Sequence, residues 1–266
     1  MKKNLILVFL FLTLNCSAAP ALNYPNFQDN PFLTDEMRPA IAPHLLPLDH
    51  PMKETLDRIF SQSRVLENEK TLVDAGFEII AGPRIYSYLI VARHPSIPGF
   101  VFKLYLDSET RCRKDISQWV WLVRRCSGAH SIRQIIKRKK IQHFVVPDKW
   151  LYVLPVYPFS SSLKPQPIIL METDMEPVSS QVSDQMWKTM ITHKHLDELY
   201  EILKHGYGGH GVTRAPNNIP YTKQGKFAFT DTEDPQAKLK LKLINKYLSK
   251  KMQRYWNSLI GNSADE

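Results

Sequence analysis

Residues 211–234 read GVTRAPNNIPYTKQGKFAFTDTED and carry the strongest indication of how this chain folds. Asn217 and Asn218 form a polar turn before the short apolar strand FAF, and acidic residues follow it from Asp231. A hairpin here would return Asn218 to the side of Asp231, thirteen positions further along. Mg²⁺ prefers such oxygen ligands and keeps waters or phosphate oxygens for its remaining positions. Two polar turns around an exposed strand are the alternative explanation.

Upstream of this segment, short β-prone runs follow one another from Gly76, separated by prolines. They read FEIIAGP, IYSYLIVARHP and GFVFKLYL, a pattern that predicts an antiparallel meander. Lys103 lies in the third run, in an otherwise apolar strand. A lysine placed there is costly unless its ammonium meets an anion or reaches water by snorkelling.

Helices and further strands follow the meander. Helical periodicity is present at 115–126 and 130–141, and β-prone runs return at 149–157 and 167–174. We expect one helix from Ser183 to His205 and a long basic helix from Gln236 to about Ile260. This order predicts the α+β class, with a mostly antiparallel first half.

Taken together, the segments between about Gly76 and Asp234 resemble the protein kinase-like superfamily. In that family a lysine of the third strand grips nucleotide phosphates, and an asparagine and an aspartate hold magnesium. The run PIILMETDMEP resembles the fifth strand and hinge, with Met171 at the back of the pocket. The loop APNNI resembles the catalytic loop, and Asp231 follows the next strand at the expected distance.

The resemblance implies a two-lobed protein kinase-like fold with an antiparallel N-lobe sheet and a minimal helical C-lobe. The N-lobe would span about 53–175 and the reduced C-lobe about 176–266. ATP and Mg²⁺ would be the ligands. The implied nucleotide-binding residues are Lys103, Met171, Glu172, Thr173 and Met175, and the implied metal ligands are Asn218, Asp231 and, as a further candidate, Glu233.

Several positions depart from the family's pattern where catalysis would need it. Thr213 stands where the loop carries its catalytic aspartate, and a threonine hydroxyl is a poor proton acceptor at neutral pH. His210 is a weak candidate base nearby. The first hairpin lacks the GxGxxG spacing, and the acid that should pair with Lys103 has only Asp115 or Gln118 as substitutes. The 35 residues after Asp231 leave no room for the usual substrate-docking helices, so we expect a pseudoenzyme.

The amino terminus has the pattern of an export signal. Lys2 and Lys3 precede an apolar run over 5–14, and small residues follow up to Ala19. The run is about half of the roughly 20 residues that cross a bilayer. We therefore expect residues 1–19 to be a cleaved signal and the mature protein to be secreted or periplasmic without a transmembrane segment; lipidation of Cys16 is the alternative. Residues 20–52, rich in proline, predict an extended arm before a domain over 53–266.

Basic residues gather in two segments of a chain whose formal net charge is +9. Residues 111–140 contain ten lysines or arginines against one aspartate, and 238–254 contain seven and no acid. A solvated helix face or a contact with an anionic partner at 111–140 would explain this pattern. A disulfide between Cys112 and Cys126 is one possibility in an exported protein, and two buried thiols are the other, since a shared helix would hold residues fourteen apart too distant.

The favoured function is a secreted kinase-like pseudoenzyme that binds a Mg-nucleotide or another phosphorylated ligand and acts as a binding or effector protein. An atypical phosphotransferase acting on a small molecule or sugar, assisted by His210 or Asp231, is the alternative. Residues 111–140 could instead bind nucleic acid or anionic lipid. Metal-dependent hydrolysis would need a different set of residues, namely His193, His195, His205 and His210. The first two lie two apart on a helix and so point to different faces.

Overall fold

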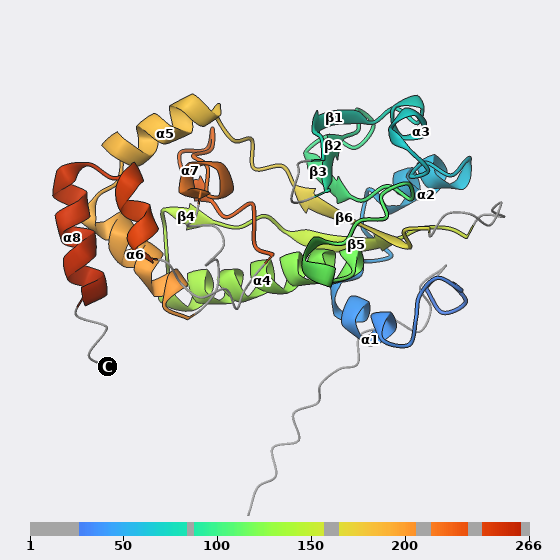
Figure 1. The fold of residues 1–266 in the computed structure, drawn as a ribbon, viewed down its shortest axis with the longest axis horizontal. Helices are drawn as coiled ribbons and strands as arrows, with labels where there is room; N and C mark the ends of the chain where they lie inside the picture. The colour runs from blue at the N-terminus through green and yellow to red at the C-terminus, as the bar shows by residue number, and fades with distance from the viewer. Residues whose placement is uncertain (1–26, 84–87, 157–164, 206–213, 234–240, 262–266) are drawn as a thin grey trace, which may run out of the picture.

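The computed structural model describes residues 27–83, 88–156, 165–205, 214–233 and 241–261 (Figure 1). A five-stranded sheet in the order β1-β2-β3-β6-β5 forms one part of the molecule. Every neighbouring pair in this sheet is antiparallel, so the predicted antiparallel sheet is confirmed. The strands are β1 Glu78–Ala81, β2 Ile90–Arg93, β3 Phe100–Leu104, β5 Lys149–Val153 and β6 Ile168–Thr173.

The register of the sheet separates a polar face from an apolar face. Val101 of β3 and Lys149 of β5 both lie opposite Glu172 of β6, so these three share a face. Phe102 lies opposite Met171, and this pair belongs to the other face. Since side chains alternate along a strand, Lys103 points to the same side as Val101. The polar side chains of the sheet therefore converge on one side.

Helices cover the apolar face. The core there joins Phe102 and Met171 to Leu56, Phe60 and Leu72 of two helices, α2 Lys53–Ser61 and α3 Glu69–Asp74. The segment before Gly76 forms two helices rather than one, because a capping box at Asn68 starts the second. Gly76 follows α3 with a φ of +93°. A glycine adopts this left-handed conformation without strain, and the chain turns into β1.

Residues 27–52 are packed against the molecule, so the prediction of an extended arm is wrong for this part. They include α1 Met37–Ile41 and the 3-10 helix η2 Ala42–His44. The Leu46 N–H donates to the Leu151 carbonyl at 2.9 Å, at the free edge of β5. Ile41 and Leu46 are fully buried. Prolines interrupt the periodicity of this segment but leave its apolar side chains free to fill the core. Residues 1–26 lie outside the described ranges, so the signal at 1–19 stays a prediction.

One long helix, α4 Gln118–Lys139, joins the sheet to a cluster of helices (Figure 1). Leu122 and Cys126 in its first half pack against Leu151 and Leu170, on the face of the sheet that also carries Glu172. Ile132 and Ile135 in its second half belong to the core of the helical cluster. The two periodic segments at 115–126 and 130–141 are thus mostly one continuous helix.

The helical cluster follows β6 along the chain. It contains α5 Ser180–Thr189, α6 His193–Leu203, α7 Ala215–Asn218, the 3-10 helix η5 Leu241–Tyr247 and α8 Lys250–Gly261. A small parallel pair, β4 Phe144–Val145 and β7 Phe227–Ala228, lies against them. The core is built around Trp187, Phe227 and Trp256, all fully buried.

The predicted lengths of both long helices in this part are wrong. The expected helix over 183–205 is two helices, because the Thr192 side chain caps a new start at His193. Its predicted starting residue, Ser183, is fully buried, and Ser179 caps α5 instead. The expected helix from Gln236 is likewise interrupted, since η5 ends at Tyr247 and α8 begins at Lys250.

Candidate functional site

A cavity of about 650 Å³ lies between the sheet and the helical cluster. Val91, Val101 and Lys103 line it from the sheet, and residues 172–175, 177 and 178, at the end of β6 and just beyond it, line its side. Pro216, Asn217 and Thr230 line it from the helical cluster. The sheet wall thus has an apolar part at Val91 and Val101, and Lys103 stands at the polar end of the cleft. Residues far apart along the chain share this cleft, which makes it the candidate site.

Two buried lysines hold one glutamate at the polar end of the cleft. The Lys103 Nζ lies 2.9 Å from Glu172 Oε1, and the Lys149 Nζ lies 2.8 Å from Glu172 Oε2. Both ammonium groups also donate to the carbonyl oxygen of Thr230, at 2.7 and 2.8 Å. The anion that Lys103 needs is therefore Glu172 of the neighbouring strand, not Asp115 or Gln118. These contacts join the sheet to the segment after β7.

Burial and charge act on this trio in opposite directions. Burial lowers the pKa of Lys149 to about 8, against the attraction of Glu172, which raises it. For Glu172, burial works toward a higher pKa, but Lys103 and Lys149 outweigh it and hold the pKa below its usual value. Glu172 is therefore ionised at neutral pH. Its carboxylate is required to keep two ammonium groups in a buried place.

Asn218 and Asp231 lie together, as their sequence pattern predicts. The short helix α7 ends at Asn218, whose carbonyl accepts a hydrogen bond from the Thr230 N–H at 3.0 Å. The Asp231 N–H approaches the same carbonyl at 3.4 Å, and the Thr230 hydroxyl donates to it at 3.2 Å. The contact is made by the main chain of Asn218. Thr230 lines the cleft, so this junction borders it.

The carboxylates of Asp231 and Glu233, which follow this junction, face two arginines: Arg125 in α4 and Arg113 just before it. The Asp231 Oδ1 lies 3.8 Å from the Arg125 guanidinium. Glu233 accepts hydrogen bonds from both Arg113 and Arg125. Burial alone would lower the pKa of Arg125, but Glu233 and Asp231 raise it above its ordinary value. Arg125 is therefore a permanent positive charge, and its side chain is only 4% exposed.

A glycine in α4 lets this acidic segment approach so closely. A Cβ on Gly128 would lie 2.1 Å from the carbonyl oxygen of Thr232, a distance that no real Cβ tolerates. The Thr232 hydroxyl donates to the Arg125 carbonyl at 2.6 Å. Main chain thus rests on main chain, and the segment from Thr230 to Glu233 is fixed to the helix.

The residues present fit a magnesium ion poorly. Glu233 is already held by two arginines, and Asp231 has a buried guanidinium beside it. A dication at Asp231 would be repelled by that guanidinium, while the nearest further carboxylate, Glu233, is already engaged by two arginines. Over the ranges that the structure describes, no three His, Cys, Asp or Glu side chains gather as a metal site. Neither Asn218 nor Asp231 is among the residues that line the cleft.

Four of the five residues predicted to bind a nucleotide line the cleft, and the fifth does not. Lys103, Glu172, Thr173 and Met175 line the cleft. Met171 does not, and its prediction as the back of the pocket is wrong. It lies on the opposite face of the sheet, fully buried among the residues under α2 and α3. A register shift of one residue moves a strand side chain to the other face, and sequence spacing alone could not settle that register.

Lys149 and Arg125 were not found by reasoning from the sequence. Lys149 stands in the apolar run KWLYV, so the argument that singled out Lys103 applies to it equally. Arg125 lies four residues after Trp121 and next to Cys126, both buried, and so falls on the inner face of α4. Its position on the otherwise apolar face of a predicted helix is the feature of the sequence that indicates a buried, paired arginine.

Among the residues that the structure describes, the histidines and cysteines form no common metal site. His193 stacks on Tyr255 at 4.0 Å between ring centroids, while His195 packs on His143 at 4.1 Å. His210, like Thr213, lies outside the described residues. Cys112 is an exposed free thiol and Cys126 a buried one, so the disulfide considered between them is not formed. Burial raises the pKa of Cys126 to about 12, which leaves it inert.

Much of the basic segment 111–140 is engaged within the protein. Arg113 and Arg125 bind Glu233, and Arg133 binds Asp148 at 2.8 Å. Lys139 binds Glu201 at 2.9 Å. The segment's positive charge therefore serves internal contacts in part, and an anionic partner there stays a prediction.

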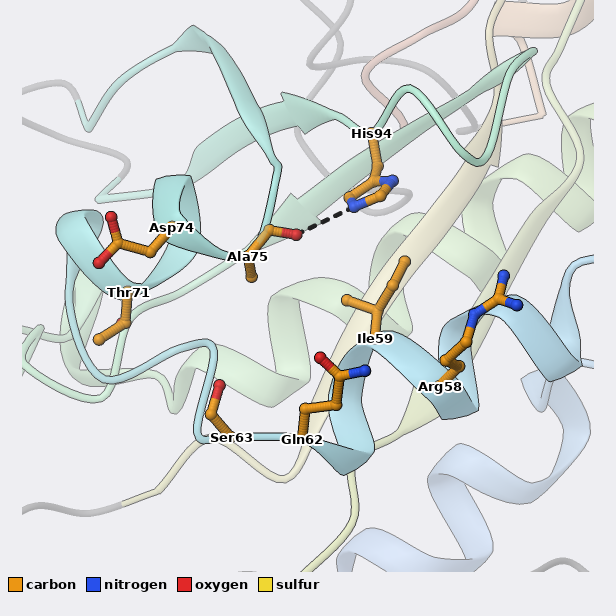
Figure 2. Close-up of a pocket in the computed structure, with 8 residues that line it drawn as sticks. All are labelled: Arg58, Ile59, Gln62, Ser63, Thr71, Asp74, Ala75 and His94. Atoms are coloured by element: carbon orange, nitrogen blue, oxygen red, sulfur yellow. Dashed lines mark hydrogen bonds between the residues drawn. The ribbon is translucent and has the colours of Figure 1, made fainter.

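A second pocket of about 360 Å³ lies beside α2 and α3 (Figure 2). His94 reaches into it, and its Nε2 lies 3.0 Å from the Ala75 carbonyl (Figure 2). Its Nδ1 accepts from the Ser96 N–H at 3.1 Å, so both ring nitrogens are used by the main chain. The Thr71 hydroxyl lies 2.9 Å from the carbonyl oxygens of both Val65 and Asn68, which share its single proton. The polar groups here hold loops in place, which makes the larger cleft the better candidate.

No protein-family model matches this chain, and a comparison with curated proteins finds no significant relative. Within the part of the chain that the structure describes, no helix has both the length and the apolar character that a bilayer crossing requires.

Proposed function

We propose that this protein is a secreted kinase-like pseudoenzyme whose cleft binds a nucleotide or another phosphorylated ligand. The observation that carries the proposal is the convergence of three elements on one cleft. These are Lys103 on an antiparallel strand, the segment that leaves β6, and the junction of Asn218 with Thr230. Their order along the chain is that of the kinase-like superfamily. On this proposal residues 53–175 and 176–266 correspond to the two lobes.

The walls of the cleft suit the two ends of such a ligand. Val91 and Val101 supply apolar side chains against which a purine ring can lie. In the segment after β6, the N–H groups of Thr173 and Asp174 already donate to the carbonyls of Asp148 and Gly99. We therefore assign the contact with the base to the main chain of Met175. The phosphate end would lie toward Lys103.

The same residues argue against phosphoryl transfer. Glu172 engages Lys103 from its own sheet, so a phosphate would share this ammonium with a carboxylate. A guanidinium stands beside Asp231, where transfer would need a metal. The loop position of the catalytic base is Thr213 in the sequence. Binding without turnover is the function that these groups support best.

Thermal unfolding with ATP, ADP and inorganic phosphate tests the proposal. We expect ATP to raise the melting temperature of the natural protein and of the control K137M, which removes an exposed lysine of α4. K103M should abolish the shift. A81W, at the half-exposed rim of the cleft, should abolish it as well without touching the charged network.

Three outcomes would count against the proposal. The absence of any shift with a nucleotide in the natural protein would refute nucleotide binding. An equal shift in K103M and A81W would place the ligand outside this cleft. Transfer of labelled phosphate from ATP to a small molecule or sugar would identify an enzyme instead. Secretion is tested separately, by the mass of the mature protein in the medium or periplasm.

A further inference from the structure

Two groups of ion pairs lie near the polar end of the cleft. Lys103 and Lys149 pair with Glu172 in the sheet and also donate to the Thr230 carbonyl, and the main chain continues from Thr230 into the second group. There Arg113 and Arg125 pair with Glu233, and Arg125 also faces Asp231. The two groups together hold four cations, Lys103, Arg113, Arg125 and Lys149, and three carboxylates, Glu172, Asp231 and Glu233. The cations exceed the carboxylates by one charge. Lys103 and Glu172 of this set line the cleft, so an anion bound beside Lys103 would lie near this surplus of positive charge.

Arg125 cannot leave its place beside Asp231 easily. Glu233 holds its guanidinium, and the Thr232 hydroxyl holds its main chain at 2.6 Å. Gly128, one turn further along α4, keeps the two segments in main-chain contact. The charge next to Asp231 is thus a rigid part of the fold.

We propose that the cleft binds its ligand as a metal-free nucleoside polyphosphate, with the fixed charge of Arg125 standing where a divalent cation would otherwise be needed. This inference rests on the proposed function, because it concerns the form in which the same cleft takes its ligand. Asp231 serves the arginine network rather than a metal. A divalent cation would have to approach Asp231 against a guanidinium that the fold does not release.

Calorimetric titration with ATP, in EDTA and in excess Mg²⁺, tests this inference. Since Mg²⁺ neutralises part of the ligand's charge and finds no place in the cleft, we expect ATP to bind at least as tightly in EDTA. Binding that becomes about tenfold tighter with Mg²⁺ would overturn the inference. The control K137M should show the same response to Mg²⁺ as the natural protein.

Titration with Mn²⁺ alone, followed by electron paramagnetic resonance, gives a measurement that does not need the nucleotide. We expect the natural protein and the variant D231N to give the same Mn²⁺ titration, because Asp231 binds no metal. Mn²⁺ bound tightly in the natural protein and lost in D231N would overturn the inference. The double variant R125M/E233Q removes one cation and one anion and should gain Mn²⁺ at Asp231. A folded double variant that gains none would show that Arg125 does not exclude the metal.

The two proposals can fail separately. If ATP binds in neither condition, the nucleotide-binding part of the proposed function is refuted, and the Mn²⁺ titration still decides whether the site takes a metal. If ATP binds only with Mg²⁺, the proposed function stands and the metal-free inference falls. Should the double variant fail to fold, the two measurements on the natural protein decide by themselves.

Discussion

Replacing Gly128 with alanine should destabilise this protein, although the same change usually stabilises a helix. Alanine is favoured over glycine inside a helix by about 1 kcal/mol. At Gly128, however, the new Cβ would lie 2.1 Å from the Thr232 carbonyl oxygen, whereas real contacts stay beyond 3.0 Å. The obstacle is main chain, which cannot rotate away as a side chain can. Either α4 or the segment after β7 must move by about 1 Å.

The cost of that movement can be set against the gain in helix propensity. Overpacking in a close-packed interior costs about 1–3 kcal/mol. The Thr232 hydroxyl would also lose its 2.6 Å hydrogen bond to the Arg125 carbonyl, worth about 1 kcal/mol. The ion pairs of Glu233 would be displaced with it. After the propensity gain is subtracted, we expect G128A to lower the free energy of unfolding by about 1–3 kcal/mol.

Urea denaturation, followed by tryptophan fluorescence, measures this change. The matched control is G261A in α8, where an added Cβ has nothing within 4 Å. It should leave the unfolding free energy unchanged or raise it by up to about 1 kcal/mol. If G128A proves as stable as the natural protein, the close main-chain contact and the rigid placement of Arg125 are refuted together.

Two further predictions concern ionisable groups, the carboxylate of Glu172 and the imidazole of His195. E172Q leaves the ammonium groups of Lys103 and Lys149 without their carboxylate and should lower the free energy of unfolding by about 3–5 kcal/mol. The double variant E172Q/K149M should recover part of this loss. Equal stability of E172Q and the natural protein would contradict the ion pairs of Glu172 with the two lysines. For His195, burial and the neighbouring His143 lower the pKa to about 4. The unfolded chain then binds more protons between about pH 4 and 6.5, so stability should fall as the pH drops through that window, by about 1–2 kcal/mol for a half-exposed ring. Denaturation at several pH values should show a flatter profile for H195N, and parallel profiles would contradict this account.

Local patterns in the sequence were sufficient for a large part of the fold. Alternation and prolines predicted the antiparallel sheet, since both act over a few residues. The turn at Asn218 and the short strand after it predicted that Asp231 returns beside it, because the two are separated by a single hairpin-like excursion. The cost of burying an ammonium singled out Lys103 before its partner was known.

Only the tertiary structure decided which groups meet across the cleft. Glu233 reaches Arg125 and Arg113 from 108 and 120 residues away along the chain. Such contacts depend on how a helix packs under a sheet, which no local periodicity specifies. The register of β6 against β3 likewise sent Glu172 to the cleft and Met171 to the opposite core. Sequence therefore predicted where charges stand along each element, and packing determined which of them became partners, because ion pairs between distant segments form only where the fold brings those segments together.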